Sequence, residues 1–272
     1  MINIKPMGRT LPAAGKGAAM VLVGLLLFGW LILTPGGLLG KADAVGYAVC
    51  HRIDARSFFM GDRQLPLCAR CSGMYLGAVT CLAFQALVSH RRAGMPHWRL
   101  WIVFAFFVAA FAIDGINSYL HLFPGAPSLY EPSNLGRLLT GSGMGLVIAF
   151  VIYPAFNQTA WKSLDMEPAL SGFVPLAAAI ILTLLIDWLV WLDNSLLLYV
   201  FALVSAFGVL LLLTMVYGVF WMMILKLDNR LVKFSGLFTP LWLGFGTALV
   251  QIAAFDLLRY FLTGTWDGFH LG

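Results

Sequence analysis

Long uncharged runs of hydrophobic residues dominate the pattern of this chain, and polar residues gather in the short segments between them. A membrane-spanning helix needs about 20 mostly apolar residues, and seven runs are close to that length or longer. The pattern therefore predicts an all-α fold, a polytopic integral membrane bundle of about seven transmembrane helices. The expected spans are roughly 18–36, 72–89, 100–122, 137–157, 169–191, 196–225 and 236–262.

Composition agrees with this pattern, because 61% of the residues are hydrophobic and 11% are charged. The uncharged run from Gly17 to Gly40 has 24 residues, which exceeds the core of a signal peptide, about 7–15 residues. We therefore expect the first helix to be retained. No linker rich in proline, serine or charge divides the chain, so we expect a single transmembrane domain over residues 1–272.

The distribution of lysine and arginine predicts the orientation. With the N-terminus inside, the cytoplasmic segments hold ten basic and three acidic residues, and the opposite side holds seven basic and nine acidic residues. Because cytoplasmic loops carry an excess of basic residues, we expect an N-in, C-out protein of the cytoplasmic (inner) membrane. The net charge of +5 follows from this topology, and no basic patch with interleaved aromatic residues indicates nucleic-acid binding.

Polar residues within the spans point to the extracytoplasmic side. Asp114, Asn117 and His121 are spaced i, i+3 and i+7, so they share one face of the third expected helix. Asn134 and Arg137 open the fourth. Because buried polar groups are costly in a membrane, this spacing predicts a functional polar pocket near the outer surface. The small residues Gly141 and Gly145, further along the fourth helix, indicate close helix packing.

Cysteine usage is concentrated in the expected extracytoplasmic loop 41–71, which contains Cys50, Cys68 and Cys71. Cys68 and Cys71 form a C-x-x-C motif at the start of the second span, where the positive end of a helix dipole stabilises thiolates. Cys81 lies about 15 Å further along the same helix, at helical rise, and is expected to be a packing residue.

Metal binding is the favoured interpretation of this loop, with Cys50, Cys68 and Cys71 as ligands and His51 as the fourth. Three thiolates and an imidazole favour Zn²⁺ in tetrahedral geometry. However, adjacent side chains such as those of Cys50 and His51 usually diverge. If His51 does not bind, His121, Asp114 or water must complete the site.

Three alternatives stay open. Cys68 and Cys71 could be the dithiol of a membrane thiol-disulfide oxidoreductase, with Cys50 as the exchanging partner. Alternatively, two of the three loop cysteines could form a disulfide that only stabilises the loop, and the third would be an unreactive thiol. The chain could also be an accessory subunit that docks on other membrane proteins through its last three spans.

Arginines in the same loop contradict the positive-inside tendency, so something is expected to neutralise them. The loop arginines are Arg52, Arg56, Arg63 and Arg70. The candidate neutralising groups are Asp54, Asp62, Asp114, Glu131, lipid phosphates or an anionic ligand.

The chain resembles an uncharacterised family of prokaryotic multi-pass membrane proteins, a domain of unknown function, over about residues 45–150. That resemblance implies no established activity, so no catalytic residue is assigned; it only groups the cysteine loop and the Asp/Asn/Arg block as one unit. The motifs that carry it are Cys50-His51, Arg56-Ser57-Phe58-Phe59, Gln64-Leu65-Pro66-Leu67-Cys68-Ala69-Arg70-Cys71, Asp114-Gly115, and Asn134, Arg137 and Thr140-Gly141.

The sequence therefore predicts a metal site, with zinc as the expected ion, above a pocket for a small anionic ligand, a lipid or a partner subunit. The expected binding partners of the protein are membrane lipid and, if it is a subunit of a complex, other membrane proteins. The expected pocket residues are Arg56, Arg70, Asp114, Asn117, His121, Asn134 and Arg137.

Overall fold

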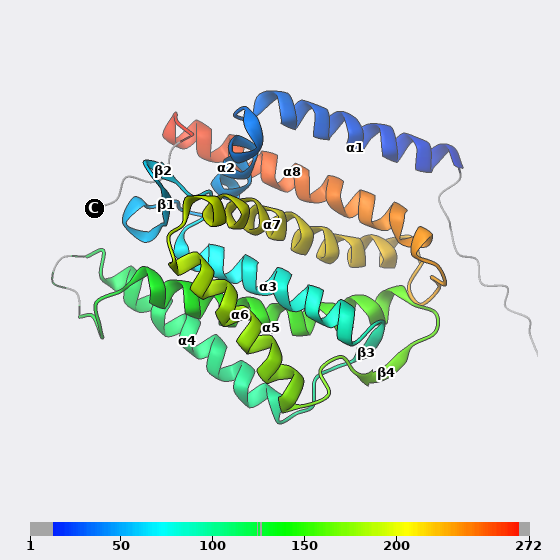
Figure 1. The fold of residues 1–272 in the computed structure, drawn as a ribbon. Helices are drawn as coiled ribbons and strands as arrows, with labels where there is room; N and C mark the ends of the chain where they lie inside the picture. Colours follow the sequence, from blue (N-terminus) through cyan, green and yellow to red (C-terminus); the bar gives the residue numbers. More distant parts are fainter. Residues whose placement is uncertain (1–12, 124, 126, 267–272) are drawn as a thin grey trace, which may run out of the picture.

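A computed structural model of the chain describes residues 13–123, 125 and 127–266. Seven helices in this part of the chain are long and apolar enough to cross a membrane, which confirms the predicted helix bundle (Figure 1). The eight α-helices are α1 (Ala13–Leu33), α2 (Gly37–Val49), α3 (Ala69–Val88), α4 (Leu100–Leu120), α5 (Asn134–Ala160), α6 (Phe173–Trp191), α7 (Ser195–Ile224) and α8 (Phe238–Thr263).

The helix α2 is the element that the hydrophobic pattern missed. It begins at Gly37, just before the expected loop 41–71, and continues into that loop. It is 13 residues long and carries Lys41 and Asp43, so it lacks the signal of a spanning helix. It packs against α7 and α8 through a cluster that includes Val45, Val209 and Ile252. The loop therefore begins as a helix that is fixed to the bundle.

Short strands mark the two ends of the bundle (Figure 1). At one end, called the cysteine end, β1 (Phe59–Met60) pairs antiparallel with β2 (Arg63–Gln64) beside α2 and the start of α3. At the other, called the strand end, β3 (Arg92–Gly94) pairs in parallel with β4 (Asp165–Pro168). Single turns of 3₁₀ helix lie in the connections, η1 (Asp54–Arg56) and η2 (Phe234–Leu237).

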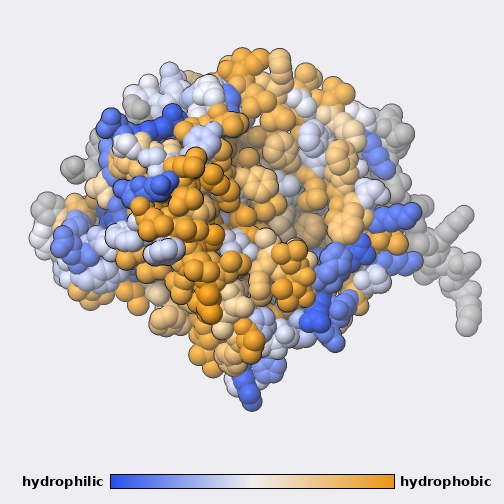
Figure 2. Space-filling model, in the orientation of Figure 1, coloured by the Kyte–Doolittle hydropathy of each residue, from blue (hydrophilic) through white to orange (hydrophobic). Residues whose placement is uncertain are grey.

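The surface between the two ends is apolar. Figure 2 shows hydrophobic residues over the middle of the visible face and hydrophilic residues gathered toward its edges. Large apolar side chains such as Phe106, Val174 and Phe220 are more than half exposed, as expected for side chains that face lipid.

The pair α3 and α5 forms the centre of the bundle, because glycines let their backbones approach closely. A Cβ atom at Gly141 would overlap the Arg70 carbonyl, and one at Gly145 would overlap the Met74 carbonyl. The predicted small-residue packing is thus confirmed. One consequence is that the start of α3, with its cysteines, lies beside the start of α5.

Candidate functional site

Close packing brings the end of α2 to the start of α3. Gly46 lies against Pro66 so tightly that a Cβ atom there would overlap the Pro66 carbonyl. Helix α2 ends at Cys50, its C-cap, and Cys68 is the N-cap of α3. Between them the hairpin β1–β2 turns at Gly61, whose φ of 59° favours glycine. The 18-residue separation of the two cysteines is therefore closed by backbone packing.

An arginine from α8 fixes the end of α2. The Arg259 guanidinium donates hydrogen bonds to the carbonyl oxygens of Tyr47 at 2.7 Å, Cys50 at 2.5 Å and His51 at 3.2 Å. These are carbonyls that a helix end leaves without partners. No local sequence pattern predicts this role, because the contact joins residues more than 200 positions apart.

Three sulfur atoms converge at this junction. The Sγ atoms of Cys50, Cys68 and Cys71 all lie within 4.8 Å of one another. Sulfurs that ligate one zinc ion tetrahedrally at about 2.3 Å are roughly 3.8 Å apart, so the trio needs little movement to bind one ion. Cys50 and Cys68 are buried, with 6% and 2% of their surface exposed.

Hydrogen bonds favour a thiolate within this trio. The backbone N–H of Cys68 donates to the Cys50 sulfur at 3.3 Å. Hydrogen bonds from the thiols of Cys68 and Cys71 hold the pKa of Cys50 well below its ordinary value. The same bond to Cys50 raises the pKa of Cys68 to about 12. Cysteine binds a metal ion as the thiolate, so binding of an ion by this trio would release the remaining thiol protons.

The two histidines lie outside the sulfur group. The His51 Nδ1 accepts a hydrogen bond from the Ile53 backbone N–H at 3.1 Å, and His51 is not among the mutually close ligand atoms. Burial lowers the pKa of His51, which favours its neutral form. His121 is exposed at the end of α4. Among the described residues, no side chain joins the three sulfurs as a fourth close ligand.

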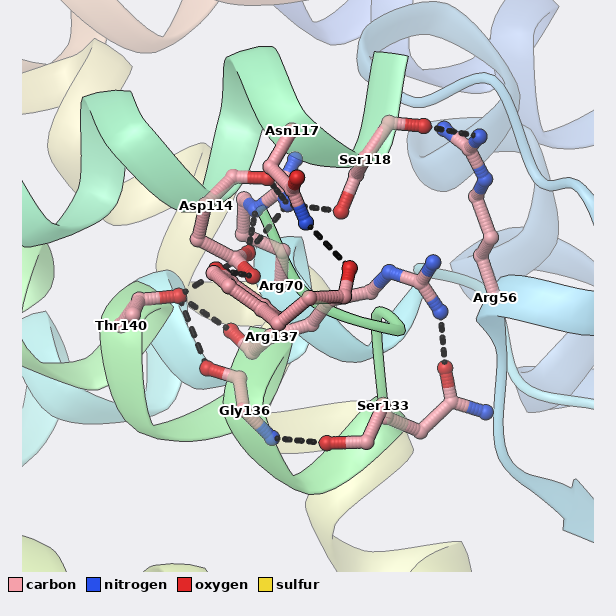
Figure 3. A network of polar contacts seen from close by, with 11 residues as sticks. Arg56, Arg70, Asp114, Asn117, Ser118, Ser133, Gly136, Arg137 and Thr140 are labelled. Atoms are coloured by element: carbon pink, nitrogen blue, oxygen red, sulfur yellow. Dashed lines mark hydrogen bonds and ion pairs between the residues drawn. The ribbon is translucent and has the colours of Figure 1, made fainter. Parts of the chain in front are cut away.

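A buried carboxylate organises the layer next to the cysteines (Figure 3). Asp114 on α4 is 1% exposed and forms an ion pair with Arg70, which lies between Cys68 and Cys71 in sequence. The Arg70 Nε donates to Asp114 at 3.1 Å, and the Tyr130 hydroxyl donates to it at 2.8 Å. Asp114 is thus committed to Arg70, which leaves it unsuited as a metal ligand.

Two asparagines tie the connecting segments to this layer. Asn117 accepts a hydrogen bond from the Leu129 N–H at 2.7 Å and donates to the Tyr130 carbonyl at 2.8 Å, so it holds the α4–α5 connection. The Asn134 amide donates to the Ser57 carbonyl at 3.3 Å. Asn117 and Asn134 therefore position backbone segments around the charged groups.

Two further arginines complete the layer. Arg56 from η1 donates to the Ser118 carbonyl at 2.6 Å, and Arg70 donates to the Ser118 hydroxyl at 3.0 Å. Arg137 on α5 donates to the Asn134 side-chain oxygen at 2.8 Å. Arg56 and Arg137 are 8% and 6% exposed, so both charges are buried. The structure therefore gathers all the expected pocket residues except His121 into one network.

The two remaining loop arginines pair with a carboxylate that was not among the predicted neutralising groups. Asp43 on α2 accepts from Arg52 at 3.1 Å and from Arg63 at 2.5 Å. Asp43 was not predicted as their partner, because it lies 20 residues before Arg63 and no local pattern places the two side by side. Cys81 is buried and lies 3.6 Å from the Thr183 hydroxyl, so it is a packing residue as expected.

The fold and this site define a polytopic membrane protein with a three-cysteine cluster and a buried arginine layer at one end. The chain belongs to the family described as "Predicted membrane protein (DUF2085)", which matches residues 50–151. The match begins at Cys50 and extends through α3 and α4 into α5, so it covers the three cysteines and the layer of Arg56, Arg70, Asp114 and Arg137. It confirms the resemblance that the motifs indicated.

Two uncharacterized relatives support this membership. A protein of Methanothermobacter thermautotrophicus is 30% identical over 103 residues, which is 37% of this chain and 82% of the relative. A protein of Methanocaldococcus jannaschii is 26% identical over 119 residues, which is 44% of this chain and 70% of the relative. No solved structure matches the chain.

Proposed function

We propose that this protein is a metal-binding membrane protein that holds one zinc ion through Cys50, Cys68 and Cys71. The observation that carries the proposal is the convergence of three sulfur atoms within 4.8 Å from the end of one helix and the start of another. Three soft thiolates favour zinc over magnesium or calcium, which prefer oxygen ligands. The fourth position is left for water or a ligand, as in zinc sites that are not closed by protein.

The proposed role of the ion is to hold α2 and α3 together above the Asp114 network. Cys50 contributes from α2, while Cys68 and Cys71 contribute from α3. A metal ion shared by the two segments would therefore fix the polar layer beneath them. We further propose that this end faces the extracytoplasmic side, because the strand end carries the excess of basic residues, including Arg91, Lys162 and Lys226.

Elemental analysis of protein purified without chelator tests the metal site. We expect about one zinc per chain in the native protein and less than about a tenth of that in Cys68→Ser, because the two thiolates that remain are too few to hold the ion. The matched control is Cys81→Ser, which should keep its zinc because Cys81 lies apart, beside Thr183. Zinc-free native protein, or equal zinc in both variants, would refute the proposal.

Labelling of intact cells tests the orientation. Asp62 in the β1–β2 turn and Glu167 on β4 are both exposed, one at each end of the bundle. We expect a membrane-impermeant maleimide to label Asp62→Cys and to leave Glu167→Cys unlabelled until the cells are broken. The reverse pattern would place the cysteine end in the cytoplasm.

A second candidate function is thiol-disulfide exchange, favoured by one observation. A cavity of about 300 Å³ lies beside Cys50, with Phe255, Leu258 and Leu262 of α8 among its largely apolar walls. A quinone that enters there could accept two electrons and two protons from the Cys50 and Cys68 thiols and leave as quinol while a disulfide forms between them. The Cys71 thiol could then exchange with that disulfide, which gives the Cys68–Cys71 disulfide and returns Cys50 to its thiol. Metal-free protein that reduces an added quinone and gains one disulfide would favour this alternative.

A further inference from the structure

The three arginines of the polar layer carry more positive charge than the described residues around them neutralise. Arg56, Arg70 and Arg137 come from η1, α3 and α5 and meet in one network (Figure 3). Asp114 is the carboxylate that acts on both Arg56 and Arg137, and it is already paired with Arg70. One carboxylate therefore faces three guanidinium groups.

The metal site does not remove this excess. Three thiolates and one zinc ion carry a single negative charge together, and Cys68 lies close enough to act on Arg56 and Arg137. Together with Asp114, a loaded metal site would leave one positive charge in excess. Buried charges of one sign repel each other and are costly unless an opposite charge compensates them.

The hydrogen bonds of these arginines are also incomplete. Arg137 is 6% exposed, and its Nε atom is buried without a hydrogen-bond partner among the described residues. Among the described residues, Arg56 and Arg137 donate hydrogen bonds to neutral oxygens, the Ser118 carbonyl and the Asn134 side-chain amide. Within the part of the chain that the structure describes, neither guanidinium group forms an ion pair with a carboxylate.

We propose that Arg56, Arg70 and Arg137 form a binding site for a phosphate group. Guanidinium groups match the geometry of phosphate oxygens, and a tetrahedral oxyanion can accept hydrogen bonds from donors that approach from three different elements. Arg70 and Arg137 lie in the first turns of α3 and α5, which are long and apolar enough to cross a membrane, and lipid headgroups surround the ends of such helices. The phosphate is therefore either that of an anionic lipid or free inorganic phosphate.

The inference does not rest on the zinc proposal, because the arginine layer is formed by α4, α5 and η1 as well as by α3. Within the layer, Asn134 joins the Arg137 side chain to the Ser57 carbonyl next to Arg56, so the two arginines are held in one place before a ligand arrives. Such a prearranged site loses less entropy when it binds.

Binding can be measured on the full-length protein in a phosphate-free nonionic detergent. One arm adds inorganic phosphate against chloride at equal ionic strength, and the other adds phosphatidylglycerol to the micelles. The readouts are the shift in Tm and the bound mass in native mass spectrometry. Stabilisation in the first arm alone identifies free phosphate, and stabilisation in the second alone identifies a lipid headgroup; stabilisation in both identifies a site open to either.

Variants connect the binding to the arginines. We expect Arg137→Gln and Arg56→Gln each to weaken binding at least about 10-fold, because each removes a charge-assisted hydrogen bond. The control is Arg63→Gln, which removes an arginine of the same loop that is paired with Asp43 and should leave binding unchanged. If Arg137→Gln does not fold, Arg137→Lys keeps the charge and should still bind, more weakly because it loses the planar fork.

Absence of binding in both arms, or equal binding by the native protein and both glutamine variants, would overturn the inference. Zinc content is measured on the same samples, so the two proposals fail separately. Loss of phosphate binding with zinc retained would leave the metal site standing, and phosphate binding by zinc-free Cys68→Ser would leave the phosphate site standing.

Discussion

The two ends of this bundle use charged residues in opposite ways. At the cysteine end, Asp114, Arg56 and Arg137 are almost fully buried, and the contacts of Asp114 and Arg56 join different elements of the bundle. At the strand end, Arg92 pairs with Asp165 at 3.8 Å and with Glu167 at 2.9 Å, and all three side chains are at least 31% exposed. Burying a network of charged side chains costs free energy, so the contrast indicates that the cysteine end is the functional end of the bundle.

Aromatic contacts at the strand end show the same difference. The Arg91 guanidinium lies 4.0 Å from the centre of the Trp161 ring and 4.5 Å from that of Phe234. This is a compact structural contact that connects the chain after α3 to the chain after α5 and to η2. Such contacts fix loops by stacking on aromatic rings, whereas the arginines of the cysteine end meet around one buried carboxylate.

The largest effect is expected from removing the buried carboxylate. Asp114→Asn leaves the Arg70 guanidinium without its opposite charge, and breaking a buried ion pair in this way costs about 3–5 kcal/mol. The measurement is the free energy or Tm of unfolding in detergent. The matched change at the other end, Asp165→Asn, should cost less than about 1 kcal/mol because its pair is half exposed. Equal losses would remove the distinction between the ends.

A smaller loss is expected from filling the contact between α3 and α5. Gly141→Ala adds a methyl group that meets the Arg70 carbonyl, and overpacking of this kind costs about 1–3 kcal/mol. Because the two helices then separate where Arg70 and the cysteines begin, zinc content should fall with stability.

Gly24→Ala is its control. No atom lies within 4 Å of a Cβ placed at Gly24, so stability and zinc content should stay the same or rise slightly. A stability loss in Gly24→Ala as large as that in Gly141→Ala would mean that the close approach of α3 and α5 is not what the first variant disturbs.

The smallest effect is expected for the exposed pairs of the strand end. Arg92→Gln removes contacts to Asp165 and Glu167 that solvent already screens, so it should change the free energy of unfolding by less than about 1 kcal/mol. Raising the salt concentration should remove even that difference. Zinc content should equal that of the native protein; a clear fall would show that the two ends are coupled.

Local sequence patterns predicted the spanning helices, because each of these helices contains a mostly apolar stretch of the length that a bilayer requires. They also predicted the cysteine trio and the Asp114 block, whose members lie close together in sequence or share a helix face. Helix α2 was missed because Lys41 and Asp43 interrupt a short segment that no length rule identifies.

The remaining parts of the site depend on contacts that no local pattern contains. His51 was an expected ligand, but its neighbour Cys50 turns toward the other sulfurs while the His51 ring accepts from Ile53. His121 shares the spacing of Asp114 but lies past the end of α4, where it is exposed. The role of Arg259 follows from the packing of α2 on α8, which only the tertiary structure reveals.

The central claim is that sulfur atoms from two helices share one metal ion, and X-ray absorption at the zinc K-edge of the purified protein tests it most directly. We predict three sulfur scatterers at about 2.3 Å and one lighter scatterer, oxygen or nitrogen, at about 2.0–2.1 Å. Protein without zinc, or zinc surrounded only by oxygen and nitrogen, would contradict the account.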